Sequence, residues 1–259
     1  MKPTQPFTSI GSSTLGVFEG LGRFSAFVGE SVRATVAGLT TWGPLLPVQM
    51  RRLGVNSLPI ALFLAAFTGI VLALQASYTF TGAIPLYFVG ALVGKTMILE
   101  LGPVLTGLAL SGRIGANIAA EIGTMRVSEQ IDALETMAYD PMAYLVVPRV
   151  LAGTLMLPVI VILSNVVGIT MGWLTALQML DMSTQQFIRG LRLFYVPFDI
   201  TYSVIKSLSF GLVITVIGCY QGFHTQGGAE GVGVATTRAV VTAGMLILVL
   251  DAFWAMVLL

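Results

Sequence analysis

The chain has 259 residues, of which 56% are hydrophobic and 10% charged, and its mean hydropathy is +0.90. Soluble domains carry about 25% charged residues, so this composition excludes a soluble enzyme, a disordered regulator and a secreted disulfide domain. The formal charge of +1 gives no support for a nucleic-acid partner. A single cysteine, Cys219, and a single histidine, His224, exclude an intrachain disulfide and disfavour a zinc site.

The N-terminal residues are predicted to form a region of their own. Between positions 7 and 41, apolar residues recur near the helical period at Phe18, Leu21, Phe24, Phe27 and Val28. This spacing favours a helix along the inner membrane interface over a loose cytoplasmic arm. No apolar run of signal-peptide length follows the first residues, so we expect an uncleaved, cytoplasmic N-terminus. We divide the chain into residues 1–52, an N-terminal cytoplasmic or interfacial helix region, and residues 53–259, a five-span domain.

Long stretches without charge mark the membrane spans. Residues 53–94, 150–180, 207–229 and 239–250 contain no Asp, Glu, Lys or Arg. Roughly 20 apolar residues cross the bilayer as a helix, whereas a β-barrel would show short segments of alternating polarity. We therefore predict an all-α integral membrane fold with spans near Ser57–Ser77, Pro85–Leu110, Leu145–Leu177, Thr201–Gly222 and Ala239–Leu259.

The positions of Lys and Arg predict how these spans are oriented. With the N-terminus inside, the inner segments hold nine of these cations and the outer loop holds two, Arg189 and Arg192. Because positive charges are enriched in cytoplasmic loops, we expect a cytoplasmic N-terminus and, after five spans, a C-terminus on the outer side.

The most charged stretch, residues 120–140, lies on the inner side between the second and third spans. Ile118, Ile122 and Met125 share one helical face, and Asp140-Pro141 follows. The pattern predicts one acidic amphipathic helix that ends at Asp140. Its apolar side could pack on the chain's own membrane domain or on a separate soluble protein, and the sequence leaves both open.

Two segments imitate nucleotide-binding motifs without meeting their requirements. In residues 89–96, Val89 stands where a phosphate-binding loop needs glycine, and the segment lies within a predicted span. The run Gly227–Gly233 has no strand ahead of it and is predicted to be a flexible inner loop. The sequence has no HExxH or GxSxG motif, so we expect no catalytic residue, metal site or cofactor in this chain.

Three charged residues, Glu100, Lys206 and Asp251, fall inside predicted spans. A charge left alone in lipid is costly, so such groups face a partner charge, a water-filled cavity or the bundle interior. Two compatible interpretations stay open. The charges form a neutralised cluster that fixes helix packing, or they form a polar wall on a substrate path.

A series of short motifs follows in a fixed order along the chain. The motifs are Glu100-Leu101-Gly102-Pro103-Val104, Gly112-Arg113-Ile114-Gly115, the run AEIGTMR at 120–126, Glu129-Gln130, Asp140-Pro141, Ile205-Lys206-Ser207, the run ATTR at 235–238 and Leu250-Asp251. The series resembles the MlaE (YrbE) permease family. The resemblance covers about residues 55–259, whereas the N-terminal arm is similar only in general character. One departure is Leu99, where well-known members have an arginine; here Lys95 stands one turn earlier.

The resemblance implies the permease subunit of an ABC transporter that moves phospholipids or related lipids between the inner and outer membranes. Family members form a homodimer in the bacterial inner membrane. A separate cytoplasmic ATPase, which holds ATP and Mg²⁺, binds below, and a periplasmic MCE-domain protein binds above. We therefore expect these two proteins, a second copy of the chain and membrane lipids as partners.

The resemblance also assigns site residues. The family's lipid pocket lies near the outer face at the dimer interface, which here implicates Leu72, Gln75, Tyr78, Glu100 and Leu101. The family's cytoplasmic coupling helix, which binds the ATPase, corresponds to the acidic segment containing Glu121, Met125, Arg126, Glu129, Asp132 and Asp140. The residues Glu100, Lys206 and Asp251 match family positions with intramembrane charge.

Two other functions remain possible on the sequence. An ATP-independent channel or ion-coupled secondary carrier would use Glu100, Lys206 and Asp251 as a proton or ion relay. A structural scaffold for the MCE ring would have no transport role at all.

Overall fold

The computed structural model describes residues 5–80 and 85–258, with side chains from Phe18 onward. Almost all of these residues are helical and no strand occurs among them, so the predicted all-α fold is confirmed. The helices are α1 (Gln5–Ala37), α2 (Leu39–Trp42), α3 (Leu46–Gln49), α4 (Leu58–Thr79), α5 (Phe88–Thr96), α6 (Gly102–Leu110), α7 (Ala116–Val127), α8 (Gln130–Thr136), α9 (Val147–Met179), α10 (Thr184–Leu193), α11 (Phe198–Phe223) and α12 (Gly228–Leu258). Short π turns at Met50–Gly54, Met97–Leu101, Ser111–Gly115 and Met142–Val146 interrupt the long helices without ending them.

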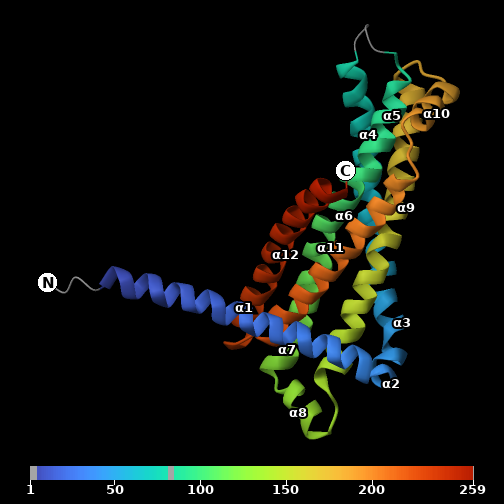
Figure 1. Cartoon of the computed structure of the whole chain (residues 1–259). Helices are drawn as coiled ribbons and strands as arrows, with labels where there is room; N and C mark the ends of the chain where they lie inside the picture. Colours follow the sequence, from blue (N-terminus) through green and yellow to red (C-terminus); the bar gives the residue numbers. More distant parts are fainter. Residues whose placement is uncertain (1–4, 81–84, 259) are drawn as a thin grey trace.

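Five continuous helical stretches are long and apolar enough to cross a membrane, as the sequence predicts. They are Leu39–Thr79, Phe88–Val127, Met142–Met179, Phe198–Phe223 and Gly228–Leu258. The second stretch has 40 residues. At 1.5 Å per residue it measures about 60 Å, twice the thickness of the hydrocarbon core. It therefore runs well past its predicted end at Leu110 and carries α7 toward the end of the bundle where α8 lies (Figure 1).

The predicted N-terminal helix is present as α1, which crosses the end of the bundle and then leaves it (Figure 1). Phe27 is buried, and Phe24 meets the ring of Tyr220 edge-on at 5.2 Å between ring centroids. Phe18 and Leu21, nearer the free end, are exposed. Exposed apolar side chains on a helix outside the bundle are typical of a helix at the membrane interface. The domain boundary at residue 52 stays a prediction, since the helical stretch Leu39–Thr79 runs through it.

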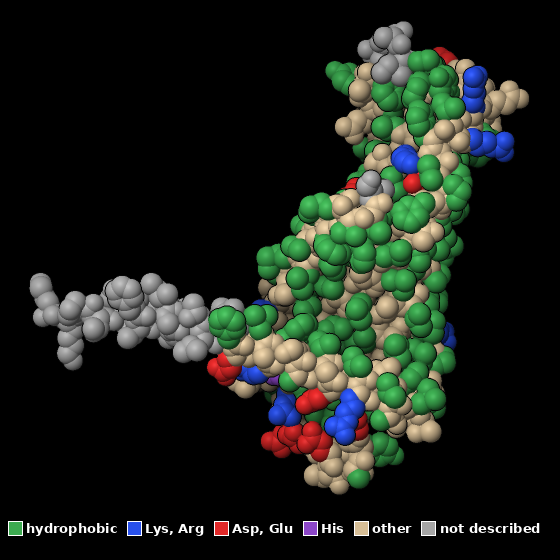
Figure 2. Space-filling view, viewed as in Figure 1, with side chains coloured by type: hydrophobic (Ala, Val, Ile, Leu, Met, Phe, Trp, Pro, Cys, Tyr) green, Lys and Arg blue, Asp and Glu red, His purple; other side chains and the backbone are tan. Residues whose placement is uncertain are grey.

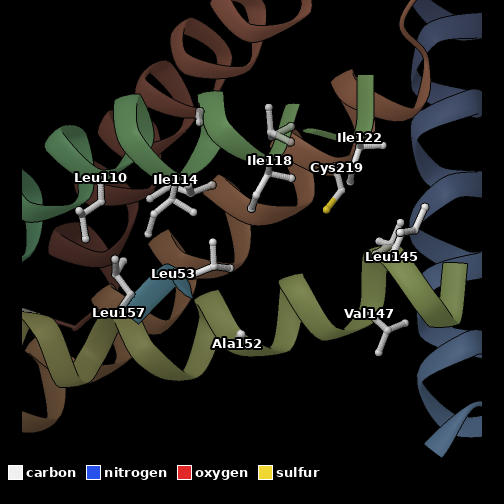
Figure 3. Close-up of a cluster of buried hydrophobic side chains, with 14 of the residues drawn as sticks. Leu53, Leu110, Ile114, Ile118, Ile122, Leu145, Val147, Ala152, Leu157 and Cys219 are labelled. Carbon is white, nitrogen blue, oxygen red and sulfur yellow. The ribbon is translucent and has the colours of Figure 1, made fainter. Parts of the chain in front are cut away.

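The main core lies where the second span, α9 and α11 meet. Leu110, Ile118, Leu157 and Phe210 are fully buried or nearly so. Figure 3 shows Ile114 and Ile118 on the second span and Leu157 on α9 directed into the space between their helices. Figure 2 shows hydrophobic side chains over the middle of the visible face, and Lys, Arg, Asp and Glu gathered at the end that carries α7 and α8. This distribution is that of a protein whose middle faces lipid.

Small residues allow α4 and α9 to approach backbone to backbone. A side chain at Gly69 would collide with the carbonyl of Gly168, so a larger residue there would force the two helices apart. Such small-residue contacts are how membrane helices gain packing when water supplies no driving force. The buried stripe of α4 repeats at every fourth position, at Ala61, Ala65, Gly69 and Ala73.

The prediction of one helix over residues 120–140 is wrong, because the structure divides this segment into α7 and α8. Glu129 adopts a left-handed backbone conformation with φ of 58° and turns the chain between the two helices. The hydroxyl of Ser128 donates to the carbonyl of Thr124 at 2.7 Å, a side-chain bond that competes with helix continuation. The α8 helix ends at Thr136, four residues before the predicted stop at Asp140.

The prediction of a flexible loop at Gly227–Gly233 is also wrong in most of its length. Only Gly227 stays outside α12, whose first turns contain the remaining residues of the run. Gly227 and Gly228 have φ of 90° and 69°, which glycine adopts without the penalty that a side chain brings. These two residues make the sharp turn, and helix geometry then resumes. The predicted end of the last span, Leu259, lies outside the described residues.

Candidate functional site

The three intramembrane charges that the sequence could not pair form one cluster. Lys206 of α11 is completely buried, and its ammonium Nζ lies 2.6 Å from the carboxylate Oε2 of Glu100. The same Nζ forms an ion pair with Asp251 of α12. The ring of Tyr202 lies 5.0 Å from Nζ, which adds a cation–π contact. The cluster therefore ties the second span, α11 and α12 together within their membrane-crossing stretches.

A proline explains the remaining contact of this lysine. In an α-helix the carbonyl of Leu99 would accept from the N–H of residue 103, but that residue is Pro103, which has no N–H. The π turn Met97–Leu101 lies at this point of the helix. The Nζ of Lys206 donates to the freed carbonyl of Leu99 at 3.1 Å. The lysine thus meets two carboxylates and one backbone carbonyl, which match the three N–H groups of an ammonium ion.

The cluster leaves one negative charge in excess. It contains two carboxylates, Glu100 and Asp251, against the single cation Lys206. The Glu100 side chain is 45% exposed, whereas that of Asp251 is 15% exposed. A half-exposed carboxylate in an otherwise apolar span is costly in lipid unless water, a polar ligand or another chain meets it. Glu100 is therefore the point at which the cluster reaches the surface of a single chain.

The five residues assigned to a lipid pocket lie on two neighbouring helices. Leu72 and Leu101 are half-buried and pack against the same apolar cluster around Ala73 and Met97. Gln75 is exposed, and Tyr78 is 86% exposed. In one chain these residues form an open surface rather than an enclosed cavity, and a pocket there needs a further molecule to close it.

A second ion pair, at the end of the bundle where α10 lies, was missed by the sequence analysis. Lys95 Nζ lies 2.7 Å from the Oδ2 of Asp199 and also donates to the carbonyl of Phe194 at 3.3 Å. Asp199 is buried and lies seven residues, or about two turns, before Lys206 on the same face of α11. The sequence already placed Lys95 inside a span, and a cation there needs an acid on another helix. A search for such an acid near the ends of the other spans would have found Asp199.

The candidate coupling residue Glu121 is held inside the bundle. Its Oε1 lies 2.8 Å from an Arg52 nitrogen and 3.2 Å from an Arg149 nitrogen. Arg149 is buried and also donates to the carbonyl of Leu145 at 2.6 Å. This network connects the first membrane-crossing stretch, Leu39–Thr79, with α7 and α9. Arg149 was not among the predicted site residues, although it is the most buried cation of this group.

The other candidate coupling residues surround the turn between α7 and α8. Arg126 and Asp132 form an exposed ion pair at 2.6 Å across the turn. Glu129 is exposed in the turn, and Met125 is half-buried and packs against the main core. Asp140 is exposed and accepts the backbone N–H of Met142 at 2.9 Å, so it marks the start of the following helical stretch. The turn that carries these side chains joins α7 and α8 at one end of the bundle (Figure 1).

Comparison with known proteins agrees with this architecture. The family model described as Permease MlaE matches residues 47–257. A probable ABC transporter permease protein of Rickettsia bellii is 37% identical over 241 residues, which cover 93% of each chain. One of Synechocystis sp. is 41% identical over 205 residues, 79% of this chain and 78% of the relative.

A further relative carries a more specific name. The intermembrane phospholipid transport system permease protein MlaE of Haemophilus influenzae is 34% identical over 250 residues, which cover 94% of each chain. The five membrane-crossing helices and these matches assign a transport role rather than catalysis. Because the family model covers residues 47–257 of 259, this chain belongs to the MlaE permease family of ABC transporter permeases.

Proposed function

We propose that this chain is the permease subunit of an ABC transporter that moves phospholipids or related lipids between the inner and outer membranes of a bacterium. It would act as a homodimer in the inner membrane, with a cytoplasmic N-terminus and a periplasmic C-terminus. ATP and Mg²⁺ would be held by a separate ATPase, and an MCE-domain protein would continue the path on the periplasmic side. The observation that carries the proposal is the alignment with the phospholipid transport permease of Haemophilus influenzae along 94% of both chains.

The transported lipid would bind at the outer half of α4 and the second span. Leu72 and Leu101 would contact acyl chains, which gain about 0.8 kcal/mol per buried CH₂. Tyr78, with its apolar ring and polar tip, suits the level of the headgroups. The open form of this surface supports a homodimer, because a second copy facing Gln75 and Tyr78 would enclose it. Glu100 would then be the polar group at the bottom of the shared pocket.

The turn between α7 and α8 would bind the ATPase. The exposed acids Glu129 and Asp132 and the half-buried Met125 and Arg126 offer it a charged surface with an apolar centre. Glu121 would act from inside, since Arg149 connects α7 to α9 and Arg52 connects α7 to the first span. A push on the turn would thereby reach the third span and, through it, the lipid surface.

A pair of substitutions tests the ATPase surface. We expect Glu129→Lys together with Asp132→Lys to abolish co-purification of the ATPase, because both reversals place positive charge on the exposed turn. Arg189→Gln, an exposed charge change in α10, is the control and should leave co-purification unchanged. Full retention of the ATPase by the doubly reversed variant would contradict a docking role for this turn.

A second experiment tests the lipid surface. We expect Leu72→Asp to lose most lipid transfer, because it places a charge where an acyl chain would lie. Leu72→Met, which keeps an apolar side chain of similar volume at the same position, should keep most of it. Unchanged transfer by Leu72→Asp would exclude this surface as the lipid site, and it would favour the scaffold function.

An ion-coupled carrier is the alternative, and the geometry of the cluster bears on it. A relay needs acids or bases that can exchange protons with both sides of the membrane. The ammonium of Lys206 is buried between two carboxylates and a carbonyl, an arrangement that suits a fixed link between helices. The carrier predicts lipid or ion transport by the chain alone in liposomes without nucleotide.

A further inference from the structure

A cavity of about 370 Å³ lies at the outer end of the bundle, between α5, α9, α10 and the start of α11. It shares no residue with the lipid surface proposed above. Pockets for small ligands span about 300–1,000 Å³, so this cavity is near the lower limit and suits one hydrocarbon chain rather than a whole two-chain lipid.

The inner wall of the cavity is apolar. Ala91 of α5, Ile98 of the following π turn, Ile169 of α9 and Leu191 of α10 contribute to it. Ile98 and Glu100 are two residues apart, which is about 200° around a helix. The cavity therefore lies on roughly the opposite side of the second span from Glu100. A hydrocarbon chain in the cavity would not compete with a lipid that contacts Glu100.

One positive charge at the cavity lacks a partner. The charge of Lys95 is balanced by Asp199, whose Oδ2 also accepts the backbone N–H of Val196 at 3.3 Å. Arg192 lines the same cavity, is exposed, and has no carboxylate within ion-pair distance among the residues that the structure describes. The wall therefore carries an excess of one positive charge, which is complementary to an anion.

The aromatic residues around the cavity indicate its depth. Phe194 and Tyr195 line it and are 45% and 46% exposed. The ring of Phe88 lies 5.6 Å from that of Phe194. Aromatic side chains concentrate where lipid headgroups meet the hydrocarbon core. Arg192 thus lies at the level of lipid phosphates, and its guanidinium suits a phosphate because it donates two parallel hydrogen bonds.

We propose that this cavity binds one acyl chain of an anionic phospholipid from the outer leaflet, with the headgroup phosphate held by Arg192. The second chain of this lipid would remain in the bilayer. The site is separate from the surface proposed for the transported lipid, and its occupancy requires neither the ATPase nor nucleotide. If the chain does not transport lipid, this site can still bind one. If this site binds no lipid, the proposed transport is unaffected.

Photo-crosslinking of the full-length protein in detergent tests the apolar part of the site. The probe is phosphatidylglycerol with a diazirine in one acyl chain. We expect saturable labelling of peptides containing Ile98, Ile169 or Leu191. Ile169→Trp fills the cavity and should lower this labelling about tenfold, the ratio that corresponds to the loss of a few buried CH₂ groups. Val166→Trp places the same ring on the exposed face of α9 and should leave the labelling unchanged.

A charge variant tests the headgroup contact. We expect Arg192→Gln to lower the labelling about tenfold, as for the loss of a charge-assisted hydrogen bond. Arg189→Gln is the matched control, because Arg189 lies over the ring of Tyr87, 5.3 Å from its centroid, and does not line the cavity. Unlabelled phosphatidylglycerol should compete with the probe, and uncharged diacylglycerol should compete far less.

Three results would overturn the proposal. They are unchanged labelling in a folded Ile169→Trp variant, equal competition by diacylglycerol, and labelling by a free fatty-acid probe where phosphatidylglycerol gives none. Ile98→Trp fills the same cavity from another helix and replaces Ile169→Trp if that variant does not fold. Size-exclusion chromatography of each variant checks the fold.

Discussion

At the scale of single residues, the buried Lys206 of α11 depends on three acceptors from two other membrane-crossing helices. Glu100, Asp251 and the carbonyl that Pro103 leaves free surround the buried ammonium of Lys206. Removing one member of a buried ion pair is costly because the other member stays buried without a partner. Neutralising all members together removes that penalty, so stability and function can be tested separately.

We predict that Lys206→Met lowers the free energy of unfolding by about 3–5 kcal/mol, because Glu100 and Asp251 lose their cation. Adding Glu100→Gln and Asp251→Asn should restore most of this stability. Thermal unfolding of the purified protein measures both effects. A triple variant as unstable as the single one would show that charge compensation is not what the cluster provides. If the triple variant is stable yet transports no lipid, the cluster also forms part of the substrate path.

Two arginines share Glu121 but differ in burial, so their substitutions should differ in effect. Arg149 has a side chain 4% exposed, and that of Arg52 is 52% exposed. We predict a loss of about 3 kcal/mol for Arg149→Ala, which leaves a polar site in the bundle unfilled. The loss for Arg52→Ala should stay below about 1 kcal/mol, as for exposed ion pairs. Equal losses in a denaturation experiment would contradict the structural role assigned to Arg149.

The identities of the site charges could be predicted from the sequence, but their contacts could not. Glu100, Lys206 and Asp251 are conspicuous because each interrupts an apolar span. Their pairing depends on which faces the helices turn toward one another. The π turn Met97–Leu101 shifts that register, and hydrophobic periodicity does not reveal it. The pair Lys95–Asp199 was missed because Asp199 lies just before the predicted start of its span.

At the scale of elements, the turn between α7 and α8 requires an unfavourable backbone at Glu129. A left-handed conformation costs a residue with a side chain about 1–2 kcal/mol, whereas glycine adopts it freely. A contact between its carboxylate and the ATPase, as proposed above, would offset this strain.

We predict that Glu129→Gly stabilises the protein by about 1 kcal/mol, because it keeps the turn and relieves the strain. Glu129→Ala should bring no such gain, since alanine keeps a side chain at positive φ. Both variants remove the carboxylate, so both should weaken co-purification of the ATPase. Chemical denaturation and pull-down on the same samples check the two effects. A Glu129→Gly variant that is less stable than the natural protein would contradict this explanation.

The elements themselves could largely be predicted, and the errors share one physical cause. Long apolar stretches identify the spans because the bilayer sets their minimum length. The distribution of charge does not show where a helix ends outside the membrane. The prediction therefore missed that the second span extends through Val127 and that the last begins at Gly228. Local backbone chemistry at Ser128, Glu129 and Gly227 sets those ends.

At the scale of the whole molecule, the chain is a membrane bundle with an apolar middle and charged side chains toward both ends (Figure 2). Gln75 and Tyr78, which we propose as lipid contacts, are exposed near one end of α4, and the acidic turn between α7 and α8 lies at the other end of the bundle (Figure 1). The long helices Leu39–Thr79, Phe88–Val127 and Met142–Met179 connect the two ends. The proposed function needs such rigid connections, because a movement caused by the ATPase at one end must reach the lipid surface near the other end.

The most direct test is lipid transfer from proteoliposomes that contain this chain with its ATPase and MCE-domain partner. Fluorescent phospholipid in the liposomes reports transfer to acceptor vesicles. We predict transfer that requires hydrolysable ATP, stops with a non-hydrolysable analogue, and falls strongly with Leu72→Asp. Equal transfer by this chain alone, without nucleotide and driven by an ion gradient, would contradict the proposed function.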